Sequence, residues 1–175
     1  AASRASFEGI WTAFWCKIQQ KTFTFQDTNI VVAESTRDLG VEVDSNLTFD
    51  QHINNIVSKA SSRIGTLFTG FCTRNPILLR RVNVSYIRPI LEYASNVWSP
   101  HLVKHINLIE CVQRRFTKRI PALNNVPYAE RLAFLDLETL EYRRLKSDLV
   151  FYYKILNGVT LWPSDLHFYY TKSST

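Results

Sequence analysis

The feature that most constrains the fold of this chain is a change in its hydrophobic period at residue 50. Beyond Asp50, apolar residues recur every three or four positions over about five helical turns. They are Ile53, Ile56, Val57, Ala60, Ile64, Leu67, Phe68 and Phe71. This spacing places them on one face of an α-helix, and we expect Asp50 to cap its first turn. Because such a face is stable only when other elements cover it, the pattern predicts a core made of helices.

The next helix is expected to begin after Asn75, with Pro76 at its first helical position. We expect it to break or kink at Arg88-Pro89. Proline lacks an N–H donor and disfavours the helical conformation in the residue before it.

A third helix is expected to follow Ser99-Pro100 and to stop at Pro121. Its predicted apolar stripe consists of Leu102, Ile106, Ile109, Val112, Phe116 and Ile120. A short helix is expected after Asn125-Val126-Pro127, and a last long one is expected between a cap at Asp136 and a stop at Asn157-Gly158. The predicted buried side of that last helix is Leu137, Leu140, Leu145, Leu149, Tyr152 and Leu156.

The start of the chain has a different character. Residues 22–26 and 30–33 favour β-structure, and Asp27-Thr28-Asn29 between them reads as a hairpin turn. A further strand is expected from Gly40 to Val43, where Gly40 would allow a close backbone approach. The predicted fold is therefore mainly α-helical, a bundle with a small N-terminal β-hairpin.

These patterns divide the 175 residues into five segments. Residues 1–21 have no assigned structure, residues 22–48 form the hairpin segment, and residues 49–98 form the first group of helices. Residues 99–158 form a basic helical extension, and residues 159–175 form a loop or truncated tail. The chain contains no methionine, so we expect it to be a piece of a longer polypeptide or a processed product.

The positive charge is concentrated in the middle of the chain. Residues 51–119 carry 11 Lys and Arg against 2 Asp and Glu, although the net charge of the whole chain is only +6. The densest group lies at the end of the third helix, where Arg114, Arg115, Lys118 and Arg119 fall within six residues. Two interpretations stay open for this group: it contacts phosphate, or it is a solvated face that complements the helix dipole.

Other kinds of site find little support. Cys16, Cys72 and Cys111 are widely spaced, which argues against a disulfide framework or a zinc cluster and favours reduced thiols inside the cell, in the cytoplasm or nucleus. His101 and His105 have helical spacing but no third metal ligand nearby. No apolar run is long enough to span a membrane, so we expect no membrane partner.

Several blocks together resemble a known family. They are Arg37-Asp38-Leu39-Gly40-Val41 with Leu47-Thr48-Phe49, Tyr86-Ile87-Arg88-Pro89-Ile90-Leu91-Glu92-Tyr93 with Val97-Trp98-Ser99-Pro100-His101, and Val112-Gln113-Arg114-Arg115-Phe116-Thr117-Lys118. In order and spacing, over about residues 25–158, they resemble the segment that follows the polymerase active site in reverse transcriptases of jockey-like non-LTR retrotransposons.

The resemblance implies a fold and a set of partners. Asp38, Leu39 and Gly40 would be the end of a polymerase palm on the primer side, and the helices after Asp50 would be a thumb. The catalytic carboxylates and their Mg²⁺ would belong to the missing upstream palm, so this chain alone would have no catalytic residues, no cofactor and no polymerase activity. Its partners would be an RNA/DNA template-primer and the absent palm and fingers.

The sequence thus predicts a retroelement polymerase fragment that holds an RNA/DNA duplex by its backbone. The predicted phosphate partners are Lys59, Arg63, Arg80, Arg81, Arg88, Arg114, Arg115, Lys118 and Arg119. The alternative is a helical protein-interaction module, derived from a decayed or domesticated retroelement, whose basic face contacts an acidic partner. The sequence does not predict an oligomeric state.

Overall fold

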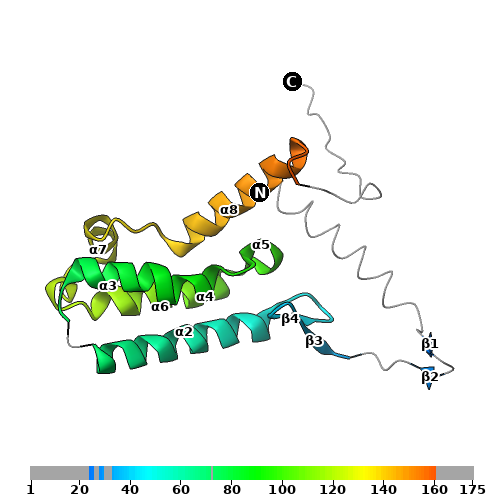
Figure 1. Cartoon of the computed structure of the whole chain (residues 1–175), viewed down its shortest axis with the longest axis horizontal. Helices are drawn as coiled ribbons and strands as arrows, with labels where there is room; N and C mark the ends of the chain where they lie inside the picture. Colours follow the sequence, from blue (N-terminus) through cyan, green and yellow to red (C-terminus); the bar gives the residue numbers. More distant parts are fainter. Residues whose placement is uncertain (1–23, 26–27, 30–32, 72, 161–175) are drawn as a thin grey trace. The chain divides into compact units, whose positions relative to one another are not determined.

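The computed structural model describes residues 24–25, 28–29, 33–71 and 73–160 (Figure 1). The chain separates into two compact units, Ala1–Thr36 and Arg37–Thr175, which we treat separately. In the first unit, β1 (Thr24–Phe25) pairs with β2 (Thr28–Asn29) in antiparallel register, Thr24 opposite Asn29 and Phe25 opposite Thr28. The hairpin is confirmed, but Thr28 and Asn29 are strand residues and not its turn. The unassigned residues 1–21 and nearly all of the predicted tail lie outside the described residues.

A second two-stranded sheet joins β3 (Ser35–Asp38) to β4 (Val41–Asp44). The two residues between the strands, Leu39 and Gly40, have φ values of 44° and 90°, as a tight hairpin turn requires. A Cβ on Gly40 would meet the ring of Tyr93 at 3.7 Å, which is an ordinary contact. Gly40 therefore serves the left-handed turn, not the close approach that was predicted, and the strand begins one residue later.

Helix α2 (Asp50–Gly70) has the extent that its apolar period predicts. The predicted cap is wrong: the N-cap is Phe49, which has φ 56° and makes no side-chain cap bond. Instead the Asp44 carboxylate accepts hydrogen bonds from the backbone N–H groups of Thr48 (3.1 Å) and Phe49 (2.8 Å). Asp50 does not cap the helix. Its side chain faces α6, where its Oδ2 lies 3.4 Å from Lys104 Nζ.

The predicted core face of α2 is largely confirmed. Ile53, Ile56, Ala60, Ile64 and Leu67 are buried, and Val57 and Phe68 pack half-buried against the same core. Phe71 is the exception, because it is the C-cap and its extended backbone (φ −107°, ψ 114°) takes it off the helical face.

The next three segments run without a break. Helix α3 (Pro76–Val82) begins at the predicted residue, and Asn75 caps it, with its Oδ1 accepting from Ile77 N–H at 2.9 Å. It passes through the π-helical turn η1 (Asn83–Ile87) into α4 (Arg88–Glu92). Of the predicted break or kink at Arg88-Pro89, the break is wrong, because the chain stays helical; the departure from α-helical geometry is the π-helical turn that ends at Ile87. The wider turn, in which Arg88 N–H bonds to Asn83 five residues back, accommodates the proline ring and its missing donor.

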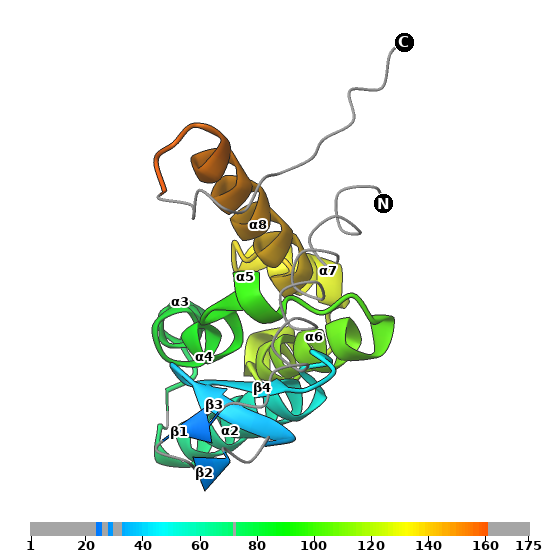
Figure 2. The ribbon, with the colours of Figure 1, turned by 90° about the vertical axis from the view of Figure 1, so that its right-hand side faces the viewer.

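The remaining helices complete the bundle. They are α5 (Ser95–Trp98), α6 (Val103–Lys118), the 3₁₀ turn η2 (Pro121–Leu123), α7 (Tyr128–Phe134) and α8 (Leu140–Leu156). Helix α2 packs against α4 and α6, and α8 packs against α5 and α6 (Figures 1 and 2). Trp98 is buried beside the first turn of α2, with its ring centroid 5.2 Å from that of His52 and its Nε1–H donating to Tyr93 O. The prediction of a mainly helical fold with a small hairpin is confirmed.

Helix α8 differs from the prediction at its start and on its buried side. Asp136 has φ 48° and lies outside the helix, while Thr139 caps it by accepting from Tyr142 N–H. The stop is confirmed, because Val159 N–H bonds to Lys154 O and Gly158 N–H to Ile155 O, the pattern of a glycine-terminated helix. Leu137 and Leu140 are buried as expected, but Leu145, Leu149, Tyr152 and Leu156 are exposed. Arg144 and Ile155 are buried in their place.

Candidate nucleic-acid interface

The predicted phosphate partners do not form one surface. Some lie where α2 faces η1, and others lie where α2 faces α6. Arg63 reaches toward η1, where its guanidinium lies 4.6 Å from the Tyr86 ring centroid and donates to Tyr86 O at 3.3 Å. Lys59, one turn away on α2, is exposed. On the side of α2 that faces α6, by contrast, Arg115 of α6 donates through its Nη1 to Ser61 Oγ of α2 at 3.4 Å. The predicted set therefore divides into separate groups.

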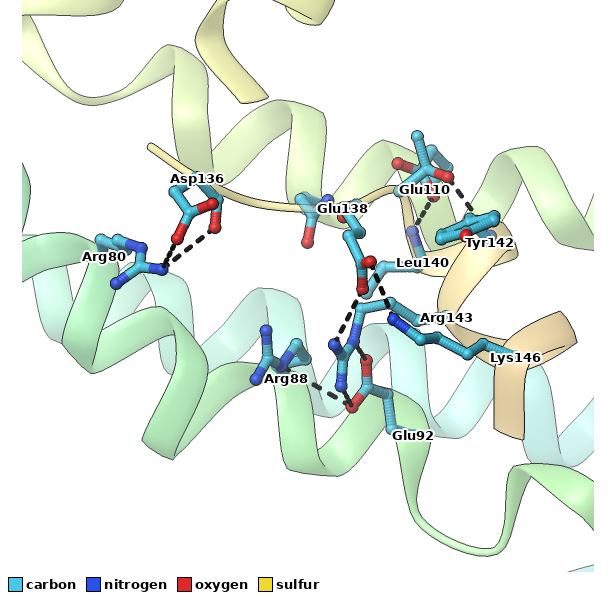
Figure 3. Close-up of polar contacts among 12 residues, drawn as sticks. Arg80, Arg88, Glu92, Glu110, Asp136, Glu138, Leu140, Tyr142, Arg143 and Lys146 are labelled. Atoms are coloured by element: carbon cyan, nitrogen blue, oxygen red, sulfur yellow. Dashed lines mark hydrogen bonds and ion pairs between the residues drawn. The ribbon is translucent and has the colours of Figure 1, made fainter. Parts of the chain in front are cut away.

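One group is largely neutralised by carboxylates. Arg80 Nη2 lies 2.6 Å from Asp136 Oδ2, and Arg88 Nε lies 3.6 Å from Glu92 Oε2. Arg143, which the sequence did not single out, holds Glu92 with two of its nitrogens and also pairs with Glu138 at 3.2 Å (Figure 3). This network joins α3 and α4 to the start of α8.

These side chains surround an open hollow of about 580 Å³. It is lined by Arg80, Arg81, Val84, Ser85, Arg88, Asp136, Glu138 and Arg143. Burial and the neighbouring Arg143 lower the pKa of the Arg88 guanidinium, while Glu92 opposes that shift. Since carboxylates already pair with Arg80, Arg88 and Arg143, the hollow is better suited to fixing helices than to binding a polyanion. Arg81 is exposed and pairs with none of these carboxylates.

The second group is the α6 basic end, which we define as Arg114, Arg115, Lys118 and Arg119. Arg115, Lys118 and Arg119 line a hollow of about 520 Å³ together with Pro121 and Asn124. No carboxylate lines this hollow, and none of the four cations forms an ion pair with another described residue. All four are exposed. The arrangement leaves three positive charges around one concave surface, and a fourth, Arg114, exposed on the same end of α6.

Two of these side chains are held in place by aromatic rings. The Arg114 guanidinium lies 5.0 Å from the ring centroid of Tyr128, and that of Arg119 lies 5.4 Å from the ring centroid of Phe68. A guanidinium stacked on a ring keeps its N–H donors directed outward in its plane. The α6 basic end can therefore present several fixed donors to an anion.

The predicted primer-side residues lie elsewhere on the bundle. Asp38 ends β3, and Leu39 and Gly40 form the turn to β4. The hydroxyl of Tyr93 donates to Leu39 O in this turn at 3.0 Å. The sheet adjoins the first turns of α2, where Glu42 N–H donates to His52 Nδ1 at 3.3 Å. The α6 basic end contacts the later turns of α2 instead. The structure does not bring these two predicted sites together.

A buried polar network beneath the α6 basic end was missed by sequence reasoning. Glu110 and Gln113 are 5% and 3% exposed, so α6 buries a polar strip beside its apolar one. Glu110 accepts from the hydroxyl of Tyr128. It also accepts from Leu140 N–H at 2.9 Å (Figure 3). Gln113 donates to Glu138 O at 3.0 Å. The signal for this polar strip in the sequence is the helical spacing of Glu110, Gln113 and Thr117. The apolar stripe on the same helix gave a stronger signal for its buried face.

This network fixes both the protonation state of the Tyr128 hydroxyl and the position of the Tyr128 ring. Burial, reinforced by the hydrogen bond to Glu110, raises the pKa of the Tyr128 hydroxyl well above its ordinary value. Tyr128 is thus neutral and acts as a donor, and its ring supports Arg114. The polar strip on one side of α6 therefore helps to position a cation on the other.

Among the described residues, no cluster of three or more His, Cys, Asp or Glu side chains could hold a metal ion. His105, once considered as a ligand, lies with its Nε2 3.1 Å from Asp50 Oδ1. In the same part of the chain, no helix has the length and apolar character needed to cross a bilayer.

Comparison with known proteins gives one relative that carries no functional description. The chain is 27% identical to an uncharacterized protein of Caenorhabditis elegans over 137 residues, which is 77% of this chain and 69% of that protein. No family model and no solved structure matches the chain.

Proposed function

We propose that the chain is a fragment of a retroelement RNA-directed DNA polymerase that binds an RNA/DNA template-primer by its backbone, without sequence preference and without the catalytic carboxylates. The observation that carries the proposal is the α6 basic end, where four cations are exposed and three of them, Arg115, Lys118 and Arg119, line a hollow that no carboxylate lines. Like charges this close repel one another, and phosphates lying opposite would relieve that repulsion.

The geometry suits backbone binding more than base reading. Arginine forks match the oxygens of a phosphate, and the stacked Arg114 and Arg119 hold those forks in fixed directions. The hollow is open, as an extended phosphate chain requires. Contacts of this kind position a duplex and carry no base information.

The resemblance to jockey-like reverse transcriptases supports the same assignment. In that family the segment follows the palm, so the described helices would serve as thumb and C-terminal extension, and the β3–β4 turn as the palm end. Under this proposal Mg²⁺ and the reacting groups belong to the upstream palm. Lys59, Arg63 and Arg81 are secondary phosphate partners, whereas Arg80 and Arg88 mainly hold the ion-pair network.

The test is fluorescence anisotropy with RNA/DNA hybrids of unrelated sequence across a salt series. Changing Arg115→Gln and Lys118→Gln together should weaken binding to every hybrid about equally. It should also flatten the slope of log affinity against log salt by up to about two units, since each lost phosphate contact removes about 0.9 for B-form DNA.

The matched control removes two positive charges elsewhere, by Lys104→Gln and Lys154→Gln. Lys104 lies at the opposite end of α6 and Lys154 on α8. This control should leave the slope nearly unchanged. Equal effects of the two pairs would indicate general attraction and no local site. An unchanged slope in both would assign the α6 basic end to dipole complementation and favour the protein-interaction alternative.

A further inference from the structure

The C-terminal helix carries an apolar strip that the bundle does not cover. Tyr142, Leu145, Leu149, Tyr152 and Leu156 are 53%, 46%, 60%, 38% and 50% exposed. The core-facing side of the same helix is formed by Leu140, Arg144 and Ile155. Large contiguous apolar strips on a soluble surface commonly mark an interaction site.

The spacing of this strip is that of a coiled-coil seam. Its members follow one another at intervals of three, four, three and four residues, from Tyr142 to Leu156. In heptad notation Tyr142, Leu149 and Leu156 occupy position a, and Leu145 and Tyr152 occupy position d. A strip that merely faced the core of its own bundle would be buried, and this one is not. The spacing therefore specifies another helix as the occupant.

The position of α8 leaves room for such a helix. In both ribbon views its C-terminal half extends away from α2, α3 and α6 (Figures 1 and 2). Its first turn is anchored by Glu110, which accepts from Leu140 N–H. The helix is thus held in shape before any partner arrives, which lowers the entropic cost of association.

The charges beside the seam indicate which helix fits. In a parallel pair, position g of one helix faces position e of the next heptad on its partner. Here that places Glu141 opposite the partner's Lys146, and the contact occurs twice by symmetry. Glu141 is exposed. Lys146 contacts Glu138 at 3.3 Å and lies 5.8 Å from the ring centroid of Tyr142; its ion pair with Glu138 is exposed and therefore easily exchanged. An antiparallel pair would align Lys146 with Tyr153 and lose both charge contacts.

We propose that α8 is a homodimerisation helix, which pairs in parallel with α8 of a second copy through the seam Tyr142, Leu145, Leu149, Tyr152 and Leu156. The seam is only two heptads long, so the interface lies near the lower end for specific complexes, about 1,200 Å² in total. The dimer is therefore reversible and depends on concentration. It is independent of the α6 basic end, and so of nucleic-acid binding.

Sedimentation equilibrium of the full chain, without nucleic acid, tests the proposal at concentrations from about 1 to 100 µM. The chain should pass from monomer to dimer across this range. Leu149→Glu places a charge at a central a position and should weaken the dimer roughly tenfold or more. The matched control is Val150→Glu, one residue along at a position that is 49% exposed and outside the seam, and it should leave the dimer intact.

A charge exchange tests the orientation. Glu141→Lys alone and Lys146→Glu alone should each weaken the dimer, because like charges would then face each other, and the double exchange should restore it. Circular dichroism shows that each variant is folded. The proposal is overturned by a folded monomer at every concentration, or by equal loss in Leu149→Glu and Val150→Glu. Failure of the double exchange to restore the dimer overturns the parallel arrangement.

Discussion

Replacing Glu110 with alanine should destabilise the bundle more than any loss of a surface charge. Glu110 is 5% exposed and accepts two hydrogen bonds, from the Tyr128 hydroxyl and from Leu140 N–H. The buried Leu140 N–H and the half-buried Tyr128 hydroxyl would both lose their acceptor. Each lost hydrogen bond to a charged group costs about 1.5–3 kcal/mol, so we expect a loss of roughly 3–6 kcal/mol in the free energy of unfolding.

Removing Glu110 also destabilises the bundle through its effect on the buried Arg144. Arg144 is 3% exposed, and neither of its Nη atoms has a hydrogen-bond partner. Burial lowers the pKa of its guanidinium, and the charge of Glu110 is the main influence opposing that shift. Without Glu110 the buried cation loses its principal countercharge. The expected loss is a large fraction of the ~5–15 kcal/mol stability of a typical domain.

Urea unfolding followed by circular dichroism measures the change, and hydrogen exchange locates it. Glu110→Gln keeps one acceptor oxygen and should cost about half as much, roughly 1.5–3 kcal/mol. Glu130→Ala is the control, because Glu130 is exposed in the first turn of α7 and should cost only about 0.5 kcal/mol. In Glu110→Ala the first turns of α8 should lose exchange protection first. A difference under about 1 kcal/mol between the two alanine variants would refute the assigned role of Glu110.

Three further predictions follow from the described residues. Ile64→Asp, at a position 1% exposed, should abolish cooperative unfolding because it buries an unpaired charge, whereas Ile77→Asp, at a position 64% exposed, should retain it; equal melting curves would contradict the burial. Burial lowers the pKa of His52 from 6.5, so the unfolded chain binds more protons there and stability should fall as the pH drops below 6.5. His52→Asn, which can still accept from Glu42 N–H, should flatten the pH dependence of unfolding near that value, and an unchanged profile would exclude His52 as its source. Finally, the chain supplied with Mg²⁺, nucleotides and a primed template should show no primer extension, and incorporation above the blank would require an unrecognised carboxylate site.

The sequence by itself determined the elements whose signals are local. The period from Ile53 to Leu67 predicted both the extent of α2 and its buried face, because that helix has a single apolar side. Asn75-Pro76 predicted the start of α3, and Asn157-Gly158 predicted the end of α8. In both cases the residues that satisfy the free backbone groups lie within one helical turn of the terminus. The concentration of charge on α6 was likewise visible before any fold was known.

Other features were decided only by tertiary structure. The carboxylate of Asp44, and not that of Asp50, fixes the entry to α2, since the left-handed Phe49 turns the chain so that Asp44 meets the free N–H groups. Pro89 did not break its helix, because a π-helical turn accommodated it. Arg80 looked like a free cation until folding placed Asp136, 56 residues along the chain, beside it.

Helix α8 shows the physical reason most clearly. Its sequence holds two candidate faces, one through Leu145, Leu149 and Tyr152, the other through Arg144 and Ile155. Periodicity favoured the more apolar face, yet the bundle buries the other. One long-range contact on the buried side is the hydrogen bond that Glu110 accepts from the N–H of Leu140 in the first turn of α8. A periodic pattern states which side chains share a face, whereas contacts between residues distant in the sequence decide what that face meets.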